Sequence, residues 1–396
     1  MGLGTRPARE AAPAWHLLEM TRRCDGCCSY CAASARPSGD LGDDMSVATA
    51  EKVVNFIFSN SRRRVSIEMQ GGEPLLNWEA VRRVIERSAA RRGEGREVSL
   101  SIVSNMRYMD SGKLAFLLAH GVNLCASLDG PAFLHRRNRP GYGAQGHGTV
   151  VRWLRCVQGL RRRHPHIEPP NAVATITRAC LPHARRIVAQ YAALGLRRIQ
   201  LGPLDPMGFA RRNWSRLGYG AEDFVRFYSE ALDSILELNA RGVPLYEKGA
   251  RLFLLRMLRR RPFGENPETS AQFTYGCDGS VYPADSARLL ANEGDDRFRM
   301  GDVDSGLDSQ KAEAVRGLFQ GGGRWYRAMC SRCRFVRFCV HISPAFDCGN
   351  TGTDDAGDSA AATRCRIYQG VFNLLFKKLK DGSQGALLRK WVNRQN

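Results

Sequence analysis

Short apolar stretches alternate with longer segments of helical periodicity across the first half of the chain. The apolar stretches predict strands, and the longer segments, which repeat apolar residues every three or four positions, predict helices. The expected strands are residues 15–20, 65–69, 98–103, 122–128, 172–177 and 198–201. The expected helices are residues 46–58, 78–90, 111–119, 149–163 and 184–194.

This succession of six strand–helix units predicts an α/β fold with a parallel sheet covered by helices. Right-handed crossovers would curl the sheet into a partial (β/α)6 barrel of the TIM type. The chemistry of such barrels lies at the carboxyl ends of the strands. We expect this core to span residues 15–205.

The second half of the chain loses the alternation. Residues 206–265 keep helical periodicity and predict a helical connector, interrupted by a glycine and two prolines at 262–267. Residues 266–375 are rich in Gly, Asp and Cys and predict a small, loop-rich domain held together by metal. Residues 371–380 predict an amphipathic helix, and we expect residues 376–396 to form a basic C-terminal tail.

Composition limits the class of protein. The 396 residues are 43% hydrophobic and 9% aromatic, which is enough for ordinary globular cores. No stretch approaches the roughly 18 uninterrupted apolar residues of a transmembrane helix, and the N-terminus lacks the apolar core of a secretory signal, so we expect no membrane partner. Cysteines cluster at 24–31 and 330–365, which predicts metal ligation in a reducing cytoplasm.

The net charge of +20 raises the question of an acidic partner. Such a charge could attract nucleic acid, an acidic peptide or an acidic electron donor. However, the arginines are spread in short runs such as 62–64, 161–163 and 259–261, and no aromatic residues alternate with them. Because single-strand binding surfaces interleave the two residue types, we expect solvated helix faces and no nucleic-acid partner.

Four cysteines lie within eight residues, directly after the first expected strand. Cys24, Cys28 and Cys31 have the spacing C-x3-C-x2-C. Three thiolates on one loop can hold three irons of a [4Fe–4S] cube and leave the fourth iron open to a ligand. The alternative is a structural zinc loop that also uses Cys27.

A second motif favours the cluster. Gln70-Gly71-Gly72-Glu73-Pro74 follows the second expected strand and would therefore lie beside the cysteine loop. The two glycines allow a ligand to approach the backbone closely, and Glu73 supplies a carboxylate. Together, the two motifs resemble those of the radical S-adenosylmethionine (radical SAM) enzymes.

The resemblance implies that the open iron binds SAM and that the reduced cluster cleaves it to a 5′-deoxyadenosyl radical, which abstracts a hydrogen atom. Cys27 would be a bystander, and the Gly-Gly-Glu-Pro motif would hold the SAM amino group. The further SAM-binding positions that the resemblance implies are Ser104, Asn105, Ser127 and Arg139. For Ser127 and Arg139, a structural turn followed by a basic loop is the alternative.

The later cysteines resemble the SPASM domain, a C-terminal extension of radical SAM enzymes that usually carries two auxiliary [4Fe–4S] clusters. The four that match the ligand set of the second auxiliary cluster are Cys330, Cys333, Cys339 and Cys365. Two ligand positions of the first auxiliary cluster hold Ala284 and Ser343 instead, and the spacing of Cys277 and Cys348 does not replace them. The resemblance therefore implies two clusters in total; a zinc site with four cysteine ligands is the alternative.

Asp285 directly follows the position that Ala284 occupies. In sulfatase-maturing members of the family, an Asp in this context takes the substrate proton, so Asp285 is the candidate catalytic base. A surface or helix-capping role is the alternative. Three remaining cysteines lie in or near expected strands or helices and are predicted to be buried apolar residues. They are Cys125, Cys156 and Cys180.

Stretches at 70–77, at 281–285 together with 288–291, and at 364–372 resemble HxsB, the radical SAM maturase of the His-Xaa-Ser peptide system. This resemblance implies a ribosomally made precursor peptide as the substrate. No separate leader-binding domain is expected before residue 15, so the barrel mouth, the C-terminal domain or a companion maturase would recognise the peptide. A flavodoxin- or ferredoxin-type protein would supply the electrons.

Three functions remain open at this point. The leading one is a radical SAM peptide maturase. The second is oxidation of a Ser or Cys in a partner enzyme, as in sulfatase maturation, which predicts three clusters. The third is a basic, zinc-binding nucleic-acid module with no enzymatic activity, which would leave the Gly-Gly-Glu-Pro motif unexplained.

Overall fold

A computed structural model of the protein describes residues 14–37, 40–61, 63–259, 272–319, 330–339, 343–346 and 360–393. In these residues, eleven strands form one sheet of order β11-β10-β9-β8-β1-β2-β3-β4-β5-β6-β7. The strands are β1 (Trp15–Glu19), β2 (Arg64–Gln70), β3 (Glu97–Ser104), β4 (Val122–Ser127), β5 (Asn171–Ile176), β6 (Arg198–Pro203), β7 (Tyr246–Glu247), β8 (Gln272–Tyr275), β9 (Ser280–Tyr282), β10 (Gly301–Asp302) and β11 (Gly306–Leu307). The eight strands β8-β1-β2-β3-β4-β5-β6-β7 pair in parallel, each with its neighbour in this order. The two edge strands of the described sheet, β7 and β11, do not pair with each other, so the barrel is open.

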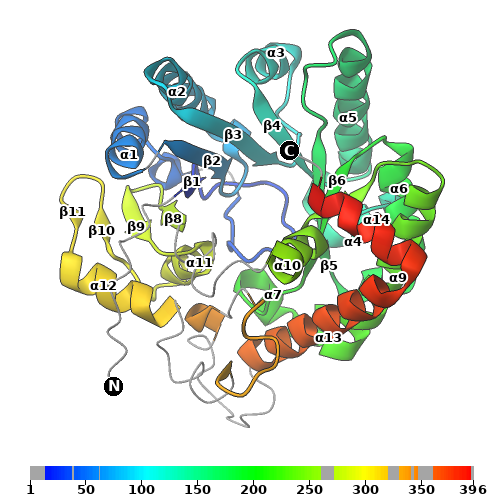
Figure 1. The fold of residues 1–396 in the computed structure, drawn as a ribbon. Coiled ribbons are helices and arrows are strands. Elements are labelled where there is room, and N and C mark those ends of the chain that lie inside the picture. Colours follow the sequence, from blue (N-terminus) through cyan, green and yellow to red (C-terminus); the bar gives the residue numbers. More distant parts are fainter. Residues whose placement is uncertain are drawn as a thin grey trace.

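Helices cover the outside of this sheet (Figure 1). In the core they are α1 (Val47–Asn60), α2 (Trp78–Ala90), α3 (Ser111–Ala119), α4 (Ala132–Asn138), α5 (Gly146–Arg163) and α6 (Ala184–Ala193). After β6 come α7 (Gly208–Arg212), α8 (Trp214–Leu217), α9 (Ala221–Ala240) and α10 (Lys248–Arg259). The expected partial (β/α)6 barrel is confirmed, and each of the six expected strands is present. None of the described helices is both long and apolar enough to span a membrane.

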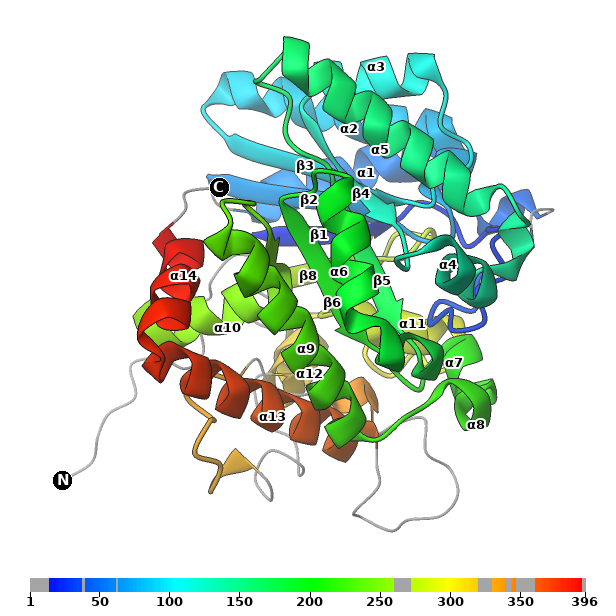
Figure 2. The ribbon, with the colours of Figure 1, turned by 90° about the vertical axis from the view of Figure 1, so that its right-hand side faces the viewer.

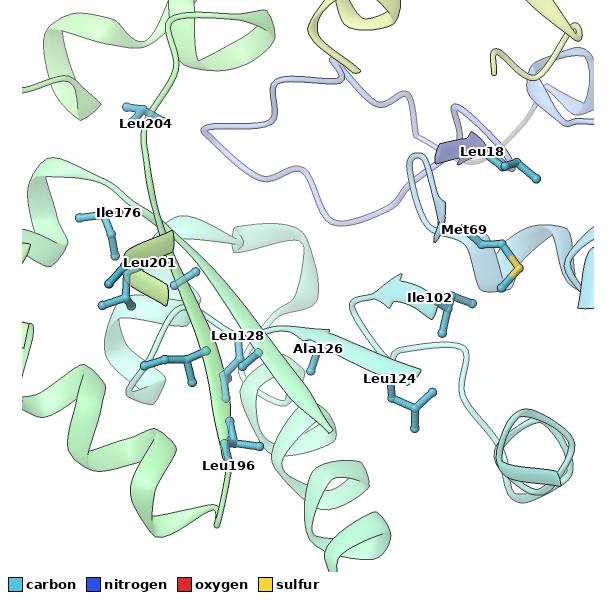
Figure 3. Packing of buried hydrophobic residues seen from close by; sticks show 14 of the residues in the cluster. Leu18, Met69, Ile102, Leu124, Ala126, Leu128, Ile176, Leu196, Leu201 and Leu204 are labelled. Carbon is cyan, nitrogen blue, oxygen red and sulfur yellow. The ribbon is translucent and has the colours of Figure 1, made fainter. Parts of the chain in front are cut away.

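The core forms because alternate strand residues are apolar. β2 buries Val65, Ile67 and Met69 against the helices, and Figure 3 shows Met69 beside Leu18 and Ile102 of the neighbouring strands. The intervening positions are polar and face the barrel interior, because successive side chains of a strand point to opposite faces. Glu68 is one of them, and the Ser101 hydroxyl of β3 donates to its carboxylate at 3.5 Å. The outer face therefore holds the fold together, while the inner face is available for chemistry.

The described strands from residue 272 onward join the core sheet. β8 pairs in parallel with β1, with Trp15 opposite Gln272 and Leu18 opposite Tyr275. The Tyr275 hydroxyl lies 3.0 Å from His16 Nδ1, and the two rings stack. The region that we expected to be loop-rich also contains α11 (Asp285–Asn292), α12 (Ser309–Gly317) and α13 (Ala360–Lys380).

The prediction of a basic tail at 376–396 is wrong for its described part. α13 continues to Lys380, and α14 (Gly382–Asn393) follows it. Leu388 and Trp391 are buried, and the Trp391 indole donates to Asn239 of α9 at 2.7 Å. Figure 2 shows α13 and α14, in red, lying along the green helices α9 and α10. Apolar residues spaced three or four apart outweigh the basic character of this segment.

Candidate active site

The cysteine loop follows β1 and is fastened to the Gly-Gly-Glu-Pro turn that follows β2. The backbone N–H of Gly72 donates to Thr21 O at 2.7 Å, and the N–H of Glu73 donates to Arg23 O at 2.8 Å. A Cβ on Gly72 would lie 2.1 Å from Arg23 O, and Gly71 has a φ of 139°. Only glycines allow this approach. The two sequence motifs therefore form one structural unit at the carboxyl ends of neighbouring strands.

Cys24, Cys28 and Cys31 lie within electrostatic reach of one another on this loop. Burial raises the pKa of the Cys24 thiol to about 11 and that of the Cys28 thiol to about 12. Cys27 is exposed and has a φ of 44°, so the chain turns this side chain away from the buried loop interior. No three His, Cys, Asp or Glu side chains of the described residues are arranged to hold a single metal ion. Three thiols without a fourth ligand fit an iron–sulfur cube with an open iron better than they fit structural zinc.

Polar groups from distant parts of the chain surround Cys24. Its Sγ accepts from the Gly26 N–H at 3.4 Å and from Asn105 Nδ2 at 3.9 Å, and it lies 3.7 Å from the Tyr142 hydroxyl. Asn105 also donates to Tyr142 at 2.8 Å. Sequence reasoning missed Tyr142, because no motif marks it and only the fold brings it over Gly26.

Glu73 joins two predicted SAM-binding segments. Its carboxylate is 1% exposed and accepts from the Leu75 N–H at 3.0 Å, the Ser104 hydroxyl at 2.8 Å and the Asn105 N–H at 2.8 Å. Burial raises the pKa of this carboxyl to about 7. Pro74 begins the short 3-10 helix Pro74–Asn77 behind it. The structure thus brings Gly71, Gly72, Glu73, Pro74, Ser104 and Asn105 together at one end of the barrel.

Arg139 lies in a buried network with two residues that sequence reasoning did not single out. Asp129 follows β4, and Arg139 directly follows α4, where a basic loop was the alternative. Arg139 pairs with Asp129 through Nε at 3.0 Å and Nη2 at 3.3 Å, and its Nη1 lies 3.8 Å from Cys28 Sγ. The Tyr30 hydroxyl donates to the same carboxylate. Ser127 is the last residue of β4 and pairs with Val173 of β5.

Asp285 is the first residue of α11 and lies at the barrel mouth. Gln70 at the end of β2 donates to its Oδ1 at 2.9 Å, and Arg288 donates to the same atom at 2.7 Å. Arg288 is 2% exposed and also pairs with Glu19 at the end of β1. The candidate base is therefore held by an arginine that no motif predicted.

Three of the four predicted auxiliary ligands lie in residues 330–339, and the fourth lies on α13. Cys330 is within electrostatic reach of Cys333 and Cys365, and burial raises the pKa of its thiol to about 11. Cys365 lies on α13 and accepts from Gln369 Nε2 at 3.3 Å. Cys339 ends a turn that begins at Phe335, and its N–H donates to Phe335 O at 3.0 Å. This donor set also suits an iron–sulfur cluster.

The two positions without cysteine lie close together. Ala284 caps α11, and Ser286 of the same helix lies 2.7 Å, oxygen to oxygen, from Ser343. Cys277 is buried within electrostatic reach of Glu19, Arg22 and Arg288, and Cys348 lies outside the described residues.

The three cysteines that we predicted to be buried apolar residues differ in their surroundings. Cys180 is buried, Cys125 is half-buried, and Cys156 is exposed on α5, so the prediction for Cys156 is wrong. Helical periodicity alone did not show that Cys156 lies on the solvent-exposed face of α5.

Residues 18–166 match the family model described as the radical SAM superfamily. The cysteine-type anaerobic sulfatase-maturating enzyme of Clostridium perfringens (strain 13 / Type A) is 21% identical over 373 residues, which cover 90% of this chain and 94% of that protein. The radical SAM cyclopropyl synthase TigE of Paramaledivibacter caminithermalis is 24% identical over 38% of this chain and 33% of its own.

Two solved structures have the same fold. Native anSMEcpe with bound AdoMet and Cp18Cys peptide superposes with a TM-score of 0.72 at 19% identity, covering 94% of this chain and 99% of its own. Streptococcus suis SuiB bound to precursor peptide SuiA superposes with a TM-score of 0.62 at 13% identity, covering 86% of this chain and 74% of its own. The radical SAM domain implies a [4Fe–4S] cluster and S-adenosylmethionine as cofactors. The cysteine loop and the first strands of the barrel thus lie in residues 18–166, which match the radical SAM superfamily, and the protein is an enzyme.

Proposed function

We propose that this enzyme is a maturase that abstracts hydrogen from a carbon of a peptide or protein substrate. The observation that carries the proposal is the joining of the cysteine loop to the Gly-Gly-Glu-Pro turn at the mouth of an open barrel. Support comes from the similarity of 90% of the chain to a sulfatase-maturating enzyme and from the shared fold of two peptide-bound structures.

In this proposal, Cys24, Cys28 and Cys31 hold the SAM cluster. When bound, the cluster and SAM supply a 5′-deoxyadenosyl radical that removes the hydrogen atom. The Gly-Gly-Glu-Pro turn offers its backbone to SAM, while Glu73 fixes Ser104 and Asn105 beside it. Ser127 and Arg139 remain predicted SAM contacts. Asp285 would accept the substrate proton as a carboxylate held by Gln70 and Arg288.

We propose one auxiliary cluster, held by the four cysteines of the later group. The Ser286–Ser343 hydrogen bond near Ala284 supports the absence of the other cluster, because hydroxyl and methyl groups stand where thiolates would be needed. The auxiliary cluster would accept the second electron or orient the peptide.

For the substrate, we propose a precursor peptide of the His-Xaa-Ser type, on the strength of the three resembling stretches. Oxidation of a Ser or Cys in a partner protein is the second candidate, and the similarity to the sulfatase-maturating enzyme favours it. A flavodoxin- or ferredoxin-type electron donor and a companion maturase complete the proposal. Incubation with both peptide classes, followed by mass spectrometry, separates these candidates.

The first test is the anaerobic iron and sulfide content of the wild type and of a Cys24/Cys28/Cys31→Ala triple variant. We expect about eight irons per chain in the wild type and about four in the variant, each as [4Fe–4S]. With dithionite, only the wild type should release 5′-deoxyadenosine from SAM. The matched control is Cys27→Ala, which should keep its iron because Cys27 is exposed. Zinc without iron after anaerobic reconstitution would refute the proposal, and about twelve irons would refute the single auxiliary cluster.

A further inference from the structure

Asp129 and Arg139 form a buried ion pair beside the cysteine loop. Asp129 is 0% exposed and Arg139 is 7% exposed. Two guanidinium nitrogens, Nε and Nη2, donate to the two carboxylate oxygens at 3.0 and 3.3 Å. This paired geometry fixes the plane of the guanidinium, and burial protects the pair from screening by salt.

Tyr30 ties this pair to the loop. Its hydroxyl donates to both oxygens of Asp129, at 2.9 and 3.1 Å, and its ring lies 5.4 Å from the Arg139 guanidinium carbon. Tyr30 directly precedes Cys31 in the chain. The guanidinium is therefore held from two sides, by Asp129 and by an aromatic face.

The third guanidinium nitrogen is directed at a cluster cysteine. Arg139 Nη1 lies 3.8 Å from Cys28 Sγ, within the reach of a hydrogen bond to sulfur. The groups on Cys24 are the N–H of Gly26, the amide of Asn105 and the hydroxyl of Tyr142, all without formal charge. A full positive charge thus lies against one thiolate position, in a water-poor environment where electrostatic effects are strong.

We propose that Arg139 is a positioning residue that sets the reduction potential of the cluster held by Cys24, Cys28 and Cys31. Reduction adds one negative charge, which a nearby cation stabilises, and hydrogen bonds to cluster sulfurs are a recognised control of the potential. Asp129 opposes this effect by partly neutralising the arginine. This inference rests on the proposed function and differs from the SAM contact expected for Arg139.

Substitutions of Arg139 and of Asp129 should shift the reduction potential in opposite directions. Arg139→Gln removes the cation and should lower the potential, whereas Asp129→Asn leaves the arginine unneutralised and should raise it. We expect each change to shift the reduction equilibrium about tenfold, which is about 59 mV for a one-electron couple. A purely structural role would not produce shifts of opposite direction.

The measurement is an EPR-monitored redox titration of the holoenzyme, following the signal that responds to added SAM. Arg139→Lys keeps the charge and should remain closer to the wild type than Arg139→Gln. Arg107→Gln is the matched control: Arg107 pairs with Asp25 of the same loop at 3.0 Å, but its side chain is 46% exposed. Because water screens this pair, its loss should shift the potential much less.

Equal potentials in the two charge variants, or shifts in the same direction, would overturn the inference. If Arg139→Gln fails to take up iron, the direction of the Asp129→Asn shift decides: upward supports the inference, and downward or unchanged contradicts it. A wild type without any SAM-responsive signal would instead contradict the proposed function, so the two failures are distinguishable.

Discussion

The environment of Glu73 makes the free energy of unfolding depend on the protonation of its carboxyl group. Burial raises the pKa of this carboxyl from 4.5 to about 7 although three donors bind it. The folded state therefore binds the proton more tightly than the unfolded chain does. As a result, the free energy of unfolding falls as pH rises through this window, and the full penalty is present above about pH 7.

We expect Glu73→Gln to remove this part of the pH dependence. Relative to the variant, the wild type should lose up to about 3 kcal/mol between about pH 4.5 and 7, from 1.36 kcal/mol per pKa unit. Denaturant unfolding at several pH values measures it. Glu94→Gln, at an exposed glutamate, is the control and should keep the wild-type profile. Parallel profiles of wild type and Glu73→Gln would contradict the burial argument.

Individual residues were predictable where a motif fixes them and unpredictable where only the fold does. The local spacing of the motifs predicts Glu73 and the loop cysteines, but no local motif predicts the residues that contact them. Tyr142 lies 118 positions from Cys24, and Arg288 lies 269 positions from Glu19. A single sequence contains no local pattern for such contacts.

At the scale of elements, the site depends on how closely two turns approach. The turn after β2 meets the loop after β1 at Gly72, where a Cβ would lie 2.1 Å from Arg23 O. Gly72→Ala must push the two segments apart, and overpacking of this kind costs about 1–3 kcal/mol. We therefore expect lower stability and reduced iron content in this variant, measured by denaturant unfolding and iron analysis.

Gly93→Ala is the matched control, since a Cβ there meets nothing within 4 Å. It should retain the iron and the stability of the wild type. Equal behaviour of the two variants would show that the turn can relax without disturbing the loop.

The six core strands were predictable because their alternation of buried and polar residues is strong and local. α4 was missed because it is short and basic, so a loop was an equally good interpretation. The pairing of β8 with β1 could not be predicted either. A strand of four residues, all of them buried, is too short for its residue pattern to indicate its neighbour.

At the scale of the whole molecule, Arg288 joins the barrel to the segment that carries the predicted auxiliary cysteines. It pairs with Glu19 of β1 and with Asp285 of its own helix, and it is 2% exposed. Arg288→Met would leave the Glu19 charge buried without this partner. We expect a loss below the ~3–5 kcal/mol of a fully broken buried pair, because Arg22 still pairs with Glu19 at 3.3 Å.

A double-mutant cycle with Glu19→Gln checks this expectation by denaturant unfolding. The double variant should lose less than the sum of the single losses, because the two side chains interact. Arg211–Glu293 is the control pair; the Arg211 side chain is 39% exposed, and the loss should be about 0–1 kcal/mol. Additive losses at Glu19 and Arg288 would show that the pair does not couple the two regions.

The parallel pairing of β1 with β8 has a consequence for synthesis on the ribosome. β1 emerges before its partner Gln272–Tyr275, which follows more than 250 positions later. At translation rates of about 5–20 residues per second, this edge waits on the order of tens of seconds for its neighbour. Throughout that time, a nascent barrel exposes an unpaired strand, a known template for aggregation. Chaperone supply and translation speed should therefore govern the yield of folded enzyme, and a gene truncated before residue 272 would leave that edge permanently bare.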